Sequence, residues 1–193
     1  LYLFRTSPTF NQADILTELD SLLRSTMESN MNTLLGDRSW KQLTMPVKLS
    51  GFGIPSPSQL SSPAYIASVL STTHLVSAIC NQVIELENAI ALWSEKLLMP
   101  QPYLEDKATE LGHAIGQACI DELTDSAPSD RDKARLLGFQ CRGSGDWIYG
   151  LPSNALGLCL TDDQFRISCG LRLGAPVSSA QLCLCGTQLD THG

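Results

Sequence analysis

The sequence has no apolar run long enough to cross a membrane and no excess of positive charge. A membrane helix needs about 18 consecutive apolar residues, and no stretch of this chain approaches that length. Lysine and arginine number 13 against 20 aspartates and glutamates, which gives a net charge of −7. A strongly basic face, the usual footprint of an autonomous nucleic-acid binder, is therefore missing at the level of composition.

The acidic residues are unevenly distributed. Residues 49–130 hold ten acidic and two basic side chains, whereas residues 1–48 hold five of each. Contact with nucleic acid would have to be local or shared with another module. The chain starts at Leu1 without a methionine and stops at DTHG, so we expect both ends to be cut from something longer.

Composition predicts a folded chain in a reducing compartment. With 193 residues, 43% hydrophobic and 17% charged, it is too apolar for a disordered protein and long enough for one sizeable core or two small ones. Its seven cysteines are odd in number, and most stand singly inside apolar patterns, where cysteine behaves as a small buried hydrophobe. We expect an intracellular location, in the nucleus or cytoplasm.

Apolar residues recur at helical spacing over most of the chain, and we find no internal repeat and no strand-like alternation longer than about four residues. The fold class is therefore mainly α. A turn and a short segment are expected around Trp40. We expect helices over 11 to about 31–36, from Pro63 to a break at STTH (71–74), from about His74 to Leu98, and over 103–123.

Two later helices carry their own capping residues. Ser129 can cap a short helix that runs through about Phe139. Thr161, followed three residues later by Gln164, fits a capping box and starts a helix that Gly174 ends. Between these helices, CRGSGDWIYGLPSN is glycine-rich and aromatic, which is typical of an ordered loop.

No catalytic residue set is visible. Polymerases use adjacent carboxylates to hold divalent metals, but Asp162 and Asp163 stand at a helix start, where carboxylates complement exposed N–H groups. The serine of GSGD is in the wrong frame for a nucleophile elbow, and GFG at 51–53 lacks the third glycine of a dinucleotide fingerprint. The three histidines are scattered along the chain, at His74, His113 and His192.

Cys183 and Cys185 are the best metal candidates. Two thiolates separated by one residue, a turn-forming Gly186 and a nitrogen donor at His192 are ligand types that zinc prefers. Three donors do not close a structural site, so unligated cysteines and a ligand pair remain equal alternatives, and the site is incomplete.

One basic cluster contains an aromatic residue. Arg38, Trp40, Lys41 and Lys48 could contact a phosphate backbone and stack a base or sugar. The alternative is a solvated rim around a core tryptophan. The cluster adjoins MPVKLSGFGIPSP, hereafter the bent loop (residues 45–57), which mixes prolines, glycines and apolar side chains.

The bent loop resembles a known motif. LYLFRTSP, a helix, SW about six residues before MPVKLSGFGIPS, and then AYIASVL are similar to the region after the catalytic palm in reverse transcriptases of non-LTR retrotransposons. In that family an L-P-x-K-x-G-G-L-G-I-like segment follows the first thumb helix. The stretch LPSNALGLCLTDDQFRISCGLRLGAPV, followed by CLCGTQLDTHG, resembles the family's post-thumb region and the start of its Cys-x-Cys-Gly knuckle.

The resemblance assigns structural roles in the bent loop. The matching thumb-motif positions include Pro46, Gly51, Gly53 and Ile54; Ser50 stands where the family often has glycine, and Phe52 where it often has leucine. Glycine would permit backbone angles or close approach that a Cβ would block, while Phe52 and Ile54 would plug the junction with the palm.

The second matched region corresponds to the knuckle. Cys183, Cys185, Gly186, Asp190 and Gly193 match it, but the family's histidine and final cysteine would lie beyond residue 193, so His192 would be a spacer. The 193 residues contain no [Phe/Tyr]-x-Asp-Asp palm motif, so we do not expect the polymerase centre in this chain.

The resemblance implies three regions. These are a helical thumb-like domain over 1–125, a post-thumb helical connector with its glycine and aromatic loop over 126–182, and a truncated knuckle over 183–193. The parent would be an RNA-directed DNA polymerase with possible zinc, and its partners would be template–primer duplex and its own palm domain.

The leading hypothesis is a non-catalytic thumb and connector that grips the duplex without reading sequence. The alternative is a helical protein-interaction module, a degraded or domesticated element fragment. An autonomous enzyme is the third possibility.

Overall fold

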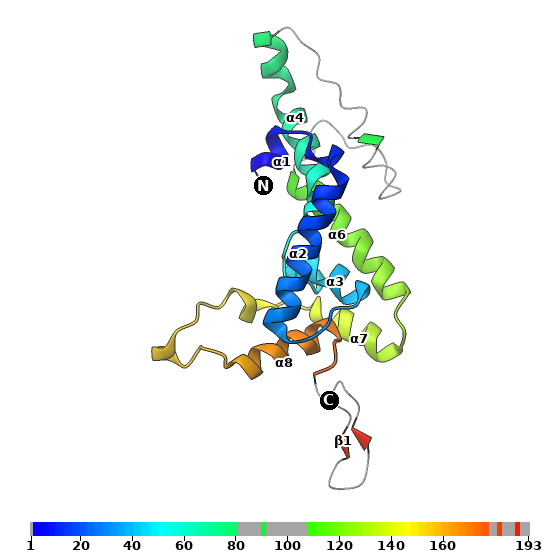
Figure 1. The fold of residues 1–193 in the computed structure, drawn as a ribbon, viewed down its shortest axis with the longest axis vertical. Helices are drawn as coiled ribbons and strands as arrows, with labels where there is room; N and C mark the ends of the chain where they lie inside the picture. Colours follow the sequence, from blue (N-terminus) through cyan, green and yellow to red (C-terminus); the bar gives the residue numbers. More distant parts are fainter. Residues whose placement is uncertain (1, 81–89, 92–107, 178–180, 183–187, 190–193) are drawn as a thin grey trace. The chain divides into compact units, whose positions relative to one another are not determined.

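The computed structural model describes residues 2–80, 90–91, 108–177, 181–182 and 188–189 (Figure 1). This part of the chain is mainly helical, as predicted. In chain order it contains α1 (Tyr2–Thr6), η1 (Thr9–Asn11), α2 (Ala13–Met31), α3 (Asp37–Thr44), η2 (Val47–Leu49), α4 (Pro57–Cys80), α6 (Ala108–Asp125), α7 (Asp130–Phe139), η3 (Asp146–Tyr149), η4 (Asn154–Leu156), α8 (Asp162–Leu173), β1 (Gln181–Leu182) and β2 (Gln188–Leu189).

The chain forms two compact units, and each is built from two separate segments. Unit 1 comprises residues 1–22 and 55–118, and unit 2 comprises residues 23–54 and 119–193. The three regions predicted from sequence motifs, with boundaries at residues 125 and 182, stay a prediction.

Unit 1 contains α1 and α4, which contact each other. The ring of Phe10 lies 5.3 Å from that of Tyr65, centroid to centroid, and Ile66 of α4 is fully buried. The Asp20 carboxylate accepts a hydrogen bond from the Ser58 N–H at 3.3 Å, within the first turn of α4. Among the described helices, none has the length and apolarity needed to cross a bilayer.

Helix α4 differs from the sequence prediction both at its expected start, Pro63, and at its expected break, 71–74. It starts at Pro57, and Pro63 lies inside it. Proline is favoured at the first helical position because its missing N–H would have no partner there. The predicted break at 71–74 is wrong, because the hydroxyls of Thr72 and Thr73 donate to carbonyls one turn back, at 2.9 and 2.7 Å, and stay within a continuous helix.

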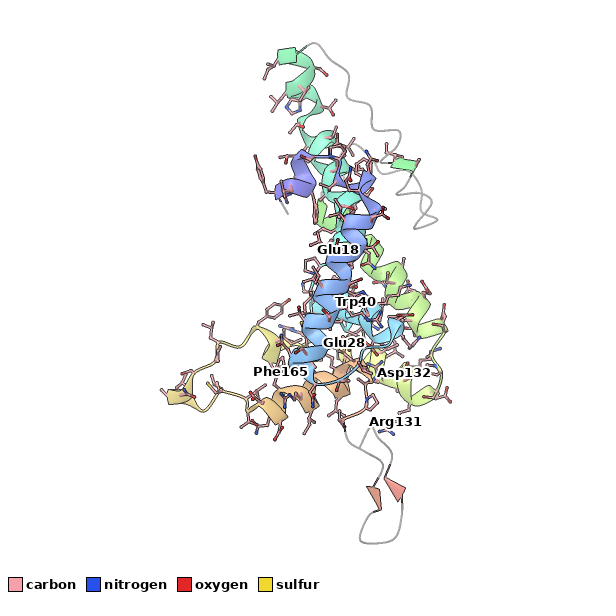
Figure 2. All side chains as sticks on the ribbon, in the orientation of Figure 1. Glu18, Glu28, Trp40, Arg131, Asp132 and Phe165 are labelled. Carbon is pink, nitrogen blue, oxygen red and sulfur yellow. The ribbon has the colours of Figure 1, made fainter. Side chains whose placement is uncertain are left out.

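Unit 2 has a core that joins segments distant in sequence. Trp40 lies on a full helix, α3, where only a turn and a short segment were expected; Figure 2 labels it. The core residues are Met31, Leu35, Leu43, Cys169, Leu173 and Ala175, with Met27, Trp40, Phe52, Ile54 and Trp147 packed against them.

The capping predictions of unit 2 are confirmed. The Ser129 hydroxyl accepts from the Asp132 N–H at the start of α7. Thr161 and Gln164 form the full capping box of α8, and Gly174 ends that helix with a φ of 65°. The loop after α7 is ordered by η3 and η4.

Other predictions fall partly outside the described residues. Of the helix expected over 74–98, residues 74–80 belong to α4, and 90–91 are helical. The helix expected over 103–123 is described from Ala108 as α6.

Candidate nucleic-acid interface

The bent loop folds back on itself through its backbone. The N–H of Gly51 donates to the Pro46 carbonyl at 3.1 Å, and the N–H of Gly53 donates to the Met45 carbonyl at 2.8 Å. A Cβ added at Gly51 would overlap the Met45 carbonyl oxygen. The close approach predicted from the sequence is therefore confirmed at Gly51.

Two residues of the bent loop adopt left-handed backbone angles. Ser50 and Gly53 each have a φ of 69°. Glycine adopts this conformation freely, whereas a residue with a Cβ pays about 1 kcal/mol. Ser50 is fully buried, and its hydroxyl donates to the Leu136 carbonyl at 2.7 Å. That hydrogen bond offsets part of the conformational cost.

The side chain of Arg172, on α8, lies against the bent loop. It is completely buried, and each of its three nitrogens donates to a backbone carbonyl. Nε bonds Gly51 at 3.1 Å, Nη2 bonds Val47 at 2.7 Å, and Nη1 bonds Ser144 at 3.2 Å. The guanidinium therefore connects α8, the bent loop and the loop after α7.

Aromatic rings complete the surroundings of Arg172. Its guanidinium carbon lies 5.7 Å from the ring centroid of Phe52 and 5.1 Å from that of Phe139, both within cation–π range. Within the described residues it pairs with no carboxylate. Burial lowers the pKa of Arg172, but a guanidinium stays protonated at neutral pH.

The sequence analysis missed Arg172. The available signal was a lone arginine between Leu171 and Leu173, near the apolar end of a helix. Phe52 and Ile54 are partly buried against the core of unit 2. Their expected contact with a palm domain stays a prediction.

Gln42, on α3, makes a second connection between these segments. Its buried amide nitrogen donates to the carbonyls of Ser50, at 3.0 Å, and Arg172, at 2.8 Å. Its amide oxygen accepts from Nη1 of Arg135 at 3.0 Å. The bent loop is thus held from two helices.

Arg38 is engaged within the protein rather than free for phosphate. Its Nη2 pairs with the Asp132 carboxylate at 2.8 Å and also donates to the Leu123 carbonyl, and its Nη1 donates to the Ser126 hydroxyl at 3.0 Å. A cation near the C-terminus of α6 complements the helix dipole.

The other members of the predicted cluster differ in exposure. Lys41 pairs with Glu122 of α6. Trp40 is half-buried against the core, and Lys48 is exposed on η2. The structure therefore places Arg38, Trp40 and Lys41 together on α3. Two of the three predicted cations, Arg38 and Lys41, form ion pairs with acidic side chains.

Asp132, labelled on α7 in Figure 2, receives two arginines. Arg135 donates to Oδ1 at 2.6 Å and Arg38 donates to Oδ2 at 2.8 Å. Burial by itself would raise the pKa of Asp132, but the hydrogen bonds and charges of Arg135 and Arg38 together outweigh it and lower the pKa.

The remaining candidates form no reactive centre in the part of the chain that the structure describes. Asp162 and Asp163 are exposed in the first turn of α8, and the described residues contain no group of three or more side chains placed to hold a metal. Burial raises the pKa of Cys169 to about 12, so its thiol stays protonated. Cys183, Cys185 and His192 lie outside the described residues.

Comparison with protein-family models, curated proteins and solved structures gave no match to this chain.

Replacing Arg172 tests the buried connection. Arg172→Met removes the donors to three carbonyls and is expected to lower the free energy of unfolding by about 3 kcal/mol or more, measured by urea denaturation. The free energy of unfolding of Arg172→Lys should lie between those of Arg172→Met and the parent chain. The control, Arg142→Met, changes an exposed arginine and should cost less than about 0.5 kcal/mol. Equal losses at both positions would contradict the role of Arg172.

Ser50 tests the left-handed backbone. Ser50→Ala and Ser50→Gly both remove the hydrogen bond to Leu136, but only glycine relieves the backbone strain. Ser50→Gly should therefore unfold with a free energy about 1 kcal/mol higher than Ser50→Ala. If Ser50→Gly and Ser50→Ala had the same urea midpoint, the left-handed φ at this position would have no free-energy cost.

Asp132 predicts a pH dependence of stability. Its pKa is lower in the folded than in the unfolded chain, so the unfolded chain takes up the proton first as the pH falls. Its contribution is present above about pH 5 and is lost as the pH falls through the folded-state pKa. Asp132→Asn should flatten the fall in unfolding free energy below about pH 5. If the unfolding free energies of the parent and of Asp132→Asn fell in parallel with pH, the predicted role of Asp132 would be wrong.

Proposed function

We propose that this chain is the non-catalytic thumb and connector of a retroelement RNA-directed DNA polymerase, and that it contacts template–primer duplex without reading its sequence. The proposal includes the palm domain of the same polyprotein as a partner. It also includes a zinc site in the full-length parent, to which Cys183 and Cys185 contribute.

The observation that carries the proposal is the contact between Arg172 and the bent loop. The resemblance rests on two separate stretches of the sequence. Arg172 of the second stretch donates to Val47 and Gly51 of the first, which lie 125 and 121 positions away. The two stretches therefore belong to one buried arrangement. Ser50, with its left-handed φ, stands where the family often has glycine, which also supports the proposal.

The ion pairs within the chain reduce the number of cations that could contact the duplex. Arg38 and Lys41 already pair with Asp132 and Glu122, so Lys48 is the exposed cation of the predicted cluster. A chain with a net charge of −7 and so few available cations can neutralise few phosphates. Duplex binding by the chain is expected to be weak and dependent on salt.

An alternative function is a helical protein-interaction module. The ion pairs of Arg38 and Lys41 favour it, because they remove two cations that the nucleic-acid hypothesis would use.

Lys48→Glu distinguishes the two functions. Binding of the 193-residue chain to a fluorescent RNA–DNA duplex is measured by anisotropy over a series of salt concentrations. We expect the variant to weaken binding several-fold and to reduce the salt slope by about 1, because one phosphate contact is lost. Lys41 is left unchanged because a glutamate there would face Glu122 and disturb folding.

Lys133→Glu is the matched control, since it makes the same charge change at an exposed position on α7. Equal effects of the two variants, or tight binding that is insensitive to salt, would reject the proposed contact and favour the interaction module.

A further inference from the structure

Residues 147–161, hereafter the leucine segment, contain no charged side chain. The segment runs out from η3 and returns to the start of α8 (Figure 1). It exposes four leucines to solvent, Leu151 by 83%, Leu156 by 73%, Leu158 by 58% and Leu160 by 49%. Exposed apolar residues are common singly, but such a concentration marks an interaction surface.

The leucine segment is ordered rather than loose. At its start, the Trp147 ring lies edge-on to Phe52 with centroids 6.1 Å apart. In its middle, Leu158 N–H donates to the Ser153 carbonyl at 3.0 Å, across a turn completed by Gly157 with a φ of 66°. At its end, Thr161 closes the capping box of α8. The segment therefore has defined contacts at its two ends and in its middle.

The charges at the ends of the segment indicate the kind of partner. Asp146 directly precedes the segment, in η3, and Asp162 and Asp163 directly follow it. All three side chains are exposed. They are the charged residues nearest to the segment in sequence, and their negative charge opposes nucleic acid. The net charge of −7 opposes a second copy of this chain. A cationic partner with an apolar side gains both electrostatic attraction and apolar burial.

We propose that the leucine segment docks a basic amphipathic segment of a protein partner, with the leucines as the apolar contact and the three aspartates as its acidic rim. This site is separate from Lys48 and does not depend on duplex binding.

A designed peptide tests the proposal. The probe is a fluorescent synthetic peptide of leucine and lysine at helical spacing, compared with the same peptide carrying glutamate in place of lysine. We expect the leucine–lysine peptide to bind the 193-residue chain, and the leucine–glutamate peptide to bind far more weakly. Leu156→Asp should weaken binding by about tenfold, as expected for a central contact.

Leu34→Asp is the matched control, because Leu34 is 85% exposed and lies outside the leucine segment. Both substitutions make the chain more negative, so attraction by charge alone would tighten binding of the cationic peptide in both. Leu158→Asp provides a second variant within the segment.

Three outcomes would overturn the proposal. These are equal affinity for the two peptides, equal effects of Leu156→Asp and Leu34→Asp, and concentration-dependent dimers that Leu156→Asp abolishes in sedimentation. The last would assign the surface to a second copy of the chain.

Discussion

A buried guanidinium needs fixed acceptors for its N–H groups, and this requirement organises unit 2. Arg172 finds these acceptors in the backbone carbonyls of Val47, Gly51 and Ser144. The bent loop, which supplies the carbonyls of Val47 and Gly51, turns at Ser50 and Gly53 with left-handed angles. Loss of the guanidinium group would remove the donors to these carbonyls, which costs more than loss of an ordinary surface contact.

The same packing explains why the predicted basic cluster is not an open cationic surface. Helix α3 presents Gln42 to the bent loop and to α8. Its two cations meet the last turn of α6 and the first turn of α7. Arg38 thereby reaches Asp132, and Lys41 reaches Glu122. Cations that look available in a sequence can serve to join helices, because opposite charges that come together in a fold are distant in the chain.

These constraints bear on function in two ways. They support the idea that the two stretches resembling a retroelement polymerase form one module, since the bent loop and α8 share a buried network. They also leave Lys48, rather than Arg38 or Lys41, as the exposed cation of the predicted cluster. Under the proposed function, exposed apolar surface such as the leucine segment would be available for contact with other parts of the polypeptide.

The sequence by itself determined the helical class, the caps at Ser129 and Thr161 and the end of α8 at Gly174, because these depend on local backbone chemistry. The sequence-based prediction was wrong about the start of α4 and about a break at 71–74. Threonine can end a helix or continue it, and here the hydroxyls of Thr72 and Thr73 bond to carbonyls of the preceding turn. Only the tertiary structure decided that Arg172 would be buried and that Arg38 and Lys41 would meet acids. Their partners lie from 28 to 125 positions away, and no local pattern encodes which distant carbonyl or carboxylate a side chain will reach.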